Sequence, residues 1–280
     1  MHQKKTRIRS YTMNRMLLGL LIFAMSAFSP ALAEGGEGSR PFDRWKVRAG
    51  AFFVLDAESE VRLDQKNGIL GTSIDFDRDL DMDTSDTVPR IDGYYRFNKH
   101  HRINLGWYEF NRSGTKVIDR EIKFGNVTFP FNAKINSFFD IQSFQASYQY
   151  SFYNVDKVEL GVSLGAHFTD VDIGLSTDEG DIEESTDTFA PLPMVGAHLR
   201  YSITPKFDVL GRWQVFALDI GDYKGFWSDT SLLLEHRTFK HVGFGGGLSA
   251  FNFDLEAEDD GFIGSFDLRM AGIFLYLKVY

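Results

Sequence analysis

The last nineteen residues of the chain, 262–280, alternate between apolar and other side chains and end on an aromatic residue. One parity holds Phe266, Leu268, Met270, Gly272, Phe274, Tyr276 and Tyr280, with Lys278 as its only charge, and the opposite parity holds Asp267 and Arg269. Successive side chains of a strand face opposite sides, so this segment predicts a strand with one apolar and one polar face. Such a strand suits a wall between lipid, which the apolar parity would face, and a polar interior.

The N-terminus has the organisation of an export signal. Five basic residues precede the apolar run 16–28, and the triplet Ala31-Leu32-Ala33 follows it. This predicts a secretory signal peptide over residues 1–33, since the run is too short to span a membrane as a helix. A complete signal also begins at Met13, and a retained N-terminal anchor is the alternative. Residues 34–43 are glycine-rich and predict a periplasmic lead-in, followed by a folded domain over 44–280.

Composition narrows the class of protein. No window after the signal holds the roughly 18 consecutive apolar residues of a membrane helix, so a membrane protein of this sequence would cross with strands. Removing the signal leaves 25 basic and 39 acidic side chains, a net charge of −14, which argues against nucleic acid as a partner. There is no cysteine, which excludes disulfides and thiolate metal sites.

Ten segments of the chain alternate with a period of two. They cover residues 44–55, 87–97, 102–124, 127–152, 158–173, 189–203, 207–220, 227–237, 242–255 and 262–280. Four short and five long connectors alternate between them, as in an all-β, transmembrane, antiparallel up-and-down barrel with both termini in the periplasm. We expect about ten strands, within a range of eight to twelve. Gly125-Asn126 is a candidate tip turn that would make the third and fourth strands a tall hairpin.

A soluble sandwich or a lipocalin-like barrel would show the same alternation with its faces reversed. The signal, the strand lengths and the asymmetry of the connectors favour the membrane barrel over these alternatives.

Several stretches resemble a known group of proteins. They are residues 71–76 (GTSIDF), 78–80 (RDL), 89–97 (PRIDGYYRF), 101–102 (HR), 112–114 (RSG) and 148–152 (YQYSF). These are similar to a family of uncharacterised Gram-negative outer-membrane β-barrel proteins, related in architecture to the small barrels of outer-membrane proteins A and W. The resemblance implies the fold and a cell outer membrane location, and it supplies no catalytic residues. By the same resemblance, the terminal aromatic Tyr280 is what the barrel-assembly machinery recognises.

Asp75, Asp77, Asp79, Asp81 and Asp83 follow one another at a spacing of two. In an extended chain all five would project from one face. Carboxylates that close favour Ca²⁺ or Mg²⁺, so the run is a candidate cation site near the extracellular rim. The alternative, which we favour, is a solvated or lumen-facing strand edge whose acids pair with interior arginines.

Charged residues of both signs share the parity expected to face the barrel interior. They are Arg90, Asp92, Arg96, Glu159, His198, Arg200, Asp208, Arg212, Glu235, Arg237, Asp267 and Arg269. Because an unpaired charge away from water is costly, these groups predict a packed ionic plug across the lumen. A barrel of about eight strands leaves room only for side chains, whereas channels appear in much wider ones, so the plug is favoured over a conducting pore.

The inward parity also holds His167 and His198, with Asp170 and Asp172 nearby in sequence. A histidine with a neighbouring carboxylate can act as a general base. The sequence lacks the arrangements that a surface protease or a lipid A deacylase of this size would need, so we expect no catalytic residues, no cofactor and no metal.

The expected function is therefore a non-enzymatic outer-membrane barrel with a structural, adhesive or surface-recognition role. Its partners would be outer-membrane lipid, lipopolysaccharide and the barrel-assembly machinery, and it would be a monomer. A small-solute channel is the first alternative and a surface hydrolase or lipid A-modifying enzyme is the second.

Overall fold

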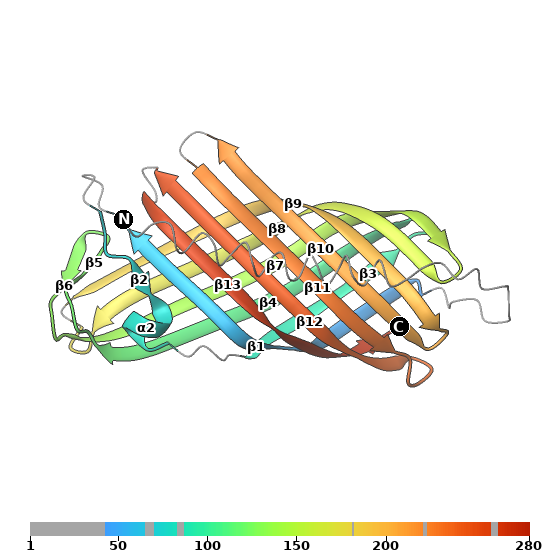
Figure 1. Ribbon diagram of the computed structural model, residues 1–280, viewed down its shortest axis with the longest axis horizontal. Coiled ribbons are helices and arrows are strands. Elements are labelled where there is room, and N and C mark those ends of the chain that lie inside the picture. The colour runs from blue at the N-terminus through green and yellow to red at the C-terminus, as the bar shows by residue number, and fades with distance from the viewer. Residues whose placement is uncertain (1–42, 65–69, 83–86, 181, 221–222, 259–262) are drawn as a thin grey trace, which may run out of the picture. The chain divides into compact units, whose positions relative to one another are not determined.

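In the computed structural model ten long antiparallel strands form a closed barrel (Figure 1). The structure describes residues 43–64, 70–82, 87–180, 182–220, 223–258 and 263–280. The barrel strands are β1 (Trp45–Leu63), β3 (Thr87–Arg96), β4 (His101–Val117), β7 (Lys134–Val155), β8 (Val158–Thr177), β9 (Glu183–Thr204), β10 (Phe207–Ile220), β11 (Tyr223–His236), β12 (Val242–Glu258) and β13 (Ile263–Val279). Each pairs with its neighbour in sequence, and β13 pairs with β1 to close the ring. This confirms the ten-stranded up-and-down topology.

The two ends of the barrel differ. Short turns join β3 to β4, β7 to β8, β9 to β10 and β11 to β12, and we call this the turn end. The other connections lie at the opposite, loop end. The loop end also holds β2 (Ile74–Asp75), α2 (Phe76–Leu80) and a separate hairpin of β5 (Ile122–Phe124) and β6 (Val127–Phe129), which Figure 1 shows gathered together. The predicted signal peptide and most of the lead-in lie outside the described residues. No described helix is long and apolar enough to cross a membrane.

The half of the wall next to the turn end is apolar outside. The exposed apolar band includes Trp45, Val47, Phe53, Leu55, Ile91, Tyr95, Phe97, Leu105, Phe144, Tyr150, Phe152, Val162, Leu164, Phe168, Val195, Trp213, Leu234, Leu248, Leu275 and Leu277. On β1 it runs from Trp45 to Leu55 and on β8 from Val158 to Phe168, which matches the nine to eleven or so residues of a tilted transmembrane strand. Aromatic residues lie at both margins, as in membrane barrels.

Most of the strands continue beyond the apolar band, and there the two faces exchange character. Outward positions now carry carboxylates, which we call the acidic collar: Asp56, Glu58, Glu60, Glu109, Asp140, Asp170, Asp172, Asp254 and Asp267. Inward positions on the same strands carry buried apolar residues such as Val61, Phe139 and Leu268. Some of the long connectors that the sequence predicts, such as the one between residues 173 and 189, are therefore largely strand.

The loop-end interior is filled by an apolar cap. Phe76 of α2 contacts Phe139 of β7, with 5.1 Å between ring centroids, and Phe139 contacts Phe266 of β13 at 5.4 Å. These contacts cross the barrel, because three strands separate β7 from β13 on the shorter way round. The cap also buries Ile74, Leu80, Met82, Ile118, Ile122, Phe124 and Phe129 from the connecting segments.

The predicted tall hairpin of the third and fourth strands is wrong in one respect. Gly125-Asn126 is the tip turn, with Gly125 at φ +55°, but the hairpin is interrupted on both sides of the tip. Pro130 has no N–H for a strand ladder, and Asn132 takes a left-handed φ of +67°. The hairpin of β5 and β6 instead bonds to the preceding loop, where Thr72 N–H donates to the carbonyl of Lys123 at 2.8 Å. It therefore closes the barrel rather than standing above it.

The closing strand has the reverse of its predicted orientation. Phe266, Leu268, Met270, Phe274 and Tyr276 are buried inside the barrel, whereas Leu275, Leu277 and Val279 lie on the exposed apolar band. The physical reason is that both parities are apolar in this strand. The side chains that were expected to face lipid fill the apolar cap and part of the lumen. The odd-numbered positions from 271 to 279 face lipid instead.

Candidate functional site

The lumen next to the turn end holds a network of ion pairs. Glu235 of β11 lies at one centre of it, with its carboxylate 2.6 Å from Lys46 Nζ, 2.8 Å from Lys278 Nζ and 3.6 Å from Arg48 Nη1. Tyr276 Oη donates to the same carboxylate at 3.1 Å. Glycines on β12 make room for these long side chains, since a Cβ on Gly245 would lie 2.3 Å from the Tyr276 ring.

In a second part of the network, Asp92 and Asp229 each bind two arginines. Arg48 donates to Asp92 at 2.5 Å, and Arg90 lies 3.6 Å from Asp92 and 3.7 Å from Asp229. Asp229 also pairs with Arg212 at 3.2 Å. Three arginines therefore share these two aspartates, and Arg48 also reaches Glu235.

Two further ion pairs join other strands of the barrel, one of them between the neighbours β9 and β10 and the other between β3 and β8, which β4 and β7 separate. Arg96 of β3 pairs with Glu159 of β8 at 2.8 Å, and Arg200 of β9 pairs with Asp208 of β10 at 2.7 Å. Near them Arg102 lies over the ring of Tyr94, 4.7 Å from its centroid, and donates to Gln149 at 2.6 Å.

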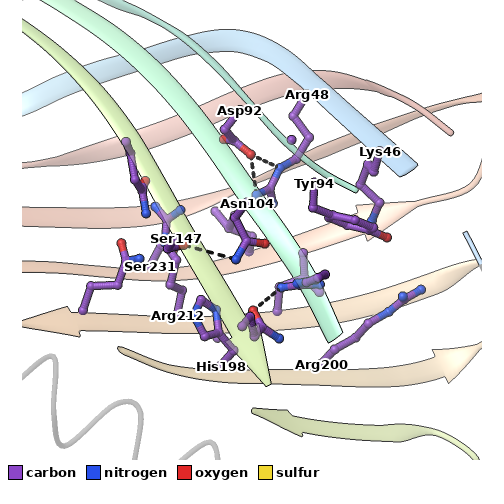
Figure 2. Close-up of a pocket in the computed structure, with 18 of the residues that line it drawn as sticks. Lys46, Arg48, Asp92, Tyr94, Asn104, Ser147, His198, Arg200, Arg212 and Ser231 are labelled. Carbon is purple, nitrogen blue, oxygen red and sulfur yellow. Dashed lines mark hydrogen bonds and ion pairs between the residues drawn. The ribbon is translucent and has the colours of Figure 1, made fainter. Parts of the chain in front are cut away.

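These side chains enclose a cavity of about 80 Å³ (Figure 2). Figure 2 shows side chains such as Lys46, Asp92, His198 and Arg212 reaching into it from different strands. Neutral donors and acceptors also line it, among them Asn104, Ser147 and Ser231. The cavity is therefore lined by charged side chains of both signs.

The structure brings most of the predicted plug residues together in this network. Arg90, Asp92, Arg96, Glu159, His198, Arg200, Asp208, Arg212 and Glu235 lie in the lumen. Arg237 is elsewhere, at the turn end, where it pairs with Asp43.

Asp267 and Arg269 do not belong to the lumen, contrary to prediction. They lie on the outer wall above the apolar band, where Arg269 is 3.5 Å from Asp267 and 3.7 Å from Glu58. Their placement follows from the reversed orientation of β13, since Phe266 and Leu268 take the inward positions. Burial and the opposing carboxylate of Asp254 raise the pKa of Asp267 to about 7.

Five charged lumen residues were missed by the sequence reasoning: Lys46, Arg48, Arg102, Asp229 and Lys278. Lys46 and Arg48 alternate with the apolar Trp45 and Val47, so strand parity alone could have found them. Lys278 shares its parity with the residues that the sequence predicts to face lipid, and that parity of β13 faces the lumen instead.

The predicted run of aspartates is not an extended edge. Asp75 caps α2, accepting hydrogen bonds from the N–H groups of Asp77 (3.1 Å) and Arg78 (2.8 Å), and Asp81 ends the helix at φ +57°. Positions two apart on a helix project to different sides, so Asp77 and Asp79 do not share a face. Asp83 lies outside the described residues. Among the residues that the structure describes, no group of three potential metal ligands comes together.

Two of these aspartates pair with arginines at the loop end. Asp77 pairs with Arg112, and partial burial raises the pKa of Asp77 despite that partner. Asp79 accepts from Arg120 at 2.5 Å and from the N–H of Asp75 at 3.0 Å. Burial raises the pKa of Asp79, but these bonds and the charge of Arg78 outweigh it and hold the pKa below its usual value.

The two inward histidines are not arranged as a general base with an acid. His167 is buried against Trp227, with 4.4 Å between ring centroids, and its Nδ1 lies 3.4 Å from Ser143 Oγ. His198 Nε2 lies 2.9 Å from Ser163 Oγ. Asp170 and Asp172 have the opposite parity to His167 and lie in the acidic collar outside the barrel.

Comparisons with known proteins give likeness in fold alone. No family model matches the sequence, and no curated protein matches it. Solved barrels that resemble the structure include the outer membrane protease OmpT from Escherichia coli, with 10% identity, a TM-score of 0.49 and coverage of 84% of this chain and 97% of that one. Another is Ail, the attachment invasion locus protein of Yersinia pestis, in complex with the heparin analogue sucrose octasulfate, with 14% identity, a TM-score of 0.38 and coverage of 84% and 99%. The chain is thus similar to small outer-membrane β-barrels.

Proposed function

We propose that this chain is a non-enzymatic outer-membrane protein that closes its own lumen and presents its loop end to the outside for surface recognition or adhesion. The observation that carries the proposal is the filling of the interior at two levels, by ion pairs inside the apolar band and by the apolar cap above it. Both termini would then lie in the periplasm with the turn end.

A small-solute channel is the alternative that this filling disfavours. The cavity of about 80 Å³ is bounded by Arg48, Arg212 and their partners, and the cap residues Phe76, Phe139 and Phe266 lie beyond it. Liposome swelling tests the choice. Proteoliposomes that contain the full chain should not swell in an isosmotic sugar solution, whereas swelling at the rate of a porin control would establish the channel.

The recognition surface in this proposal is the acidic collar. Nine carboxylates of the collar lie on the outer wall beyond the apolar band, with Arg269 among them, and like charges oppose each other directly in the pairs Asp140 with Asp172 and Asp254 with Asp267. Such a surface attracts a positively charged partner. Cells that display the chain should adhere to an amine-coated surface more than cells that display a variant with four collar aspartates changed to asparagine. Equal adhesion at low salt would contradict the role of the collar.

The hydrolase alternative lacks support in the placement of the histidines. His167 packs on Trp227 inside the wall, and the carboxylates of Asp170 and Asp172 are on the other side of the same strand. General base catalysis needs the acid and the histidine within hydrogen-bond reach.

The remaining partners of the proposal follow from the surface. Lipid and lipopolysaccharide would contact the exposed apolar band. A closed barrel has no free strand edge to pair with another chain, which favours a monomer. In the folded chain Tyr280 Oη donates to the carbonyl of Phe239 at 2.8 Å, so the assembly machinery would engage Tyr280 before this bond forms.

A further inference from the structure

The lumen network holds more cations than anions. The cations are Lys46, Arg48, Arg90, Arg96, Arg102, Arg200, Arg212 and Lys278, and the carboxylates are Asp92, Glu159, Asp208, Asp229 and Glu235. Among the described residues, eight positive charges against five negative ones leave an excess of three. The pair of Arg237 with Asp43 at the turn end does not change this difference.

The excess is concentrated around the cavity. Six of the cations line it, namely Lys46, Arg48, Arg90, Arg102, Arg200 and Arg212, but only Asp92 and Glu159 of the carboxylates do. Arg102 stands out among them, because it forms no ion pair with any carboxylate of the described residues. Its contacts are the neutral Gln149 oxygen at 2.6 Å and the Tyr94 ring. Uncompensated charge inside a protein is costly, so a counter-ion at this place would stabilise the fold.

The cavity has the size and the donors for such an ion. A volume of about 80 Å³ is several times the minimum that one water molecule needs, so it can hold a small anion. Guanidinium groups match the geometry of oxyanions, to which they donate two parallel hydrogen bonds. The amide of Asn104 and the hydroxyls of Ser147 and Ser231 supply neutral donors on the same wall.

We propose that the lumen cavity binds one small tetrahedral oxyanion, of the class of phosphate or sulfate, with Arg102 as its principal ligand. This site is independent of what the loop end recognises. It makes the lumen plug a composite of side chains and a bound anion.

Gln149 gives the sharpest test of the site. Its amide oxygen already accepts a hydrogen bond from Arg102, so Gln149→Glu places a permanent negative charge beside Arg102 with almost no change of shape. If the site holds an oxyanion, the new carboxylate replaces it. Arg102→Gln removes the ligand instead, and Arg269→Gln, on the outer wall, is the matched control.

The experiment is thermal unfolding of the full chain, refolded in detergent micelles, against increasing millimolar phosphate or sulfate, with the ionic strength held by an anion too large for the cavity. We expect a saturable rise in Tm that reaches about 5 °C or more at a hundred times Kd. A general salt effect would need far higher concentrations and would not saturate.

The variants decide between the site and a general effect. Gln149→Glu should melt higher than the wild type without phosphate and should lose the response, Arg102→Gln should lose the response, and Arg269→Gln should keep it. The proposal is overturned if the wild type shows no saturable rise, or if Gln149→Glu responds to phosphate as the wild type does. If Arg102→Gln does not fold, the Gln149→Glu measurement decides alone.

Discussion

The ammonium group of Lys278 lies 2.8 Å from the carboxylate of Glu235, and neither side chain is exposed to solvent. Lys278 is on the last strand and Glu235 is on β11, while Lys46, which binds the same carboxylate, is on the first strand. One carboxylate therefore links the strands on both sides of the seam at which the barrel closes. Inside the apolar band, these ion pairs add side-chain contacts to the backbone ladder that joins β1 and β13 at the seam.

Glu235→Gln should destabilise the barrel strongly. The substitution leaves Lys46, Lys278 and Arg48 without their shared partner, and loss of one member of a buried ion pair costs about 3–5 kcal/mol. The free energy of unfolding in urea, measured in detergent, checks this. Glu58→Gln, at a side chain that is 62% exposed, should change it by about 0.5 kcal/mol or less. Equal effects of the two substitutions would show that the Glu235 network does not hold the seam.

Phe139→Ala should weaken the apolar cap. Phe139 is fully buried between Phe76 and Phe266, and truncation of such a residue costs about 3–5 kcal/mol. The neighbouring Phe138 points outward and is 39% exposed, so Phe138→Ala should cost about 1 kcal/mol or less. Urea unfolding of both variants makes the comparison, and a larger loss for Phe138→Ala would reverse the orientation described for β7.

The stability of the loop end should depend on the ionisation of Asp267. Partial burial and Asp254 raise the pKa of Asp267 to about 7, above its value in the unfolded chain. A raised pKa favours the protonated form in the folded state, so its contribution is full below about pH 4 and is lost as the pH rises to about 7. Because the side chain is 47% exposed, we expect a loss of only about 1 kcal/mol.

Asp267→Asn should remove this decrease in the free energy of unfolding between acid and neutral pH. Glu58→Gln, on the same face of the collar, serves as the control and should keep the decrease. Parallel pH profiles for the wild type and Asp267→Asn would contradict the coupling of Asp254 with Asp267.

Cysteine labelling tests the orientation. The chain has no cysteine, so a single introduced thiol reports alone. Glu58→Cys in the acidic collar should react with a membrane-impermeant maleimide on intact cells, and Lys157→Cys in the β7 to β8 turn should react only after the outer membrane is permeabilised. The reverse pattern would place the turn end outside.

The sequence predicted the number of strands and their order because alternation and connector length are local signals. Its errors about which side chains face the lumen share one cause, which is that the strands cross two environments. From Trp45 to Leu55 the outward positions of β1 are apolar. After a bulge between Val54 and Asp56, toward the loop end, the outward positions are Asp56, Glu58 and Glu60. The rule that apolar residues face lipid holds for the half of a strand next to the turn end. In the half next to the loop end, the apolar residues face the interior instead.

The closing strand shows the same limit. Phe266 and Leu268 fill the cap, whereas Leu275 and Leu277 face lipid, so neither parity is polar enough to mark the interior. The charge of Lys278 shows which face of β13 lines the lumen only when its partner Glu235 is known. That contact joins residues 43 positions apart in the sequence. The cap could not be predicted either, because the positions of Asp77 and Asp79 depend on Arg112 of β4 and on Arg120 of the segment between β4 and β5, both distant in sequence.

Single-channel recording in planar bilayers tests the closed lumen most directly. The full chain, inserted in its folded form as shown by its heat-modifiable mobility, should give no stepwise conductance. The reason is that the ion pairs of Glu235, Asp92 and Asp229 and the cap around Phe139 lie across the lumen. Reproducible conductance steps from the wild-type chain, which disappear when a control protein is inserted in its place, would contradict a closed barrel and favour a channel.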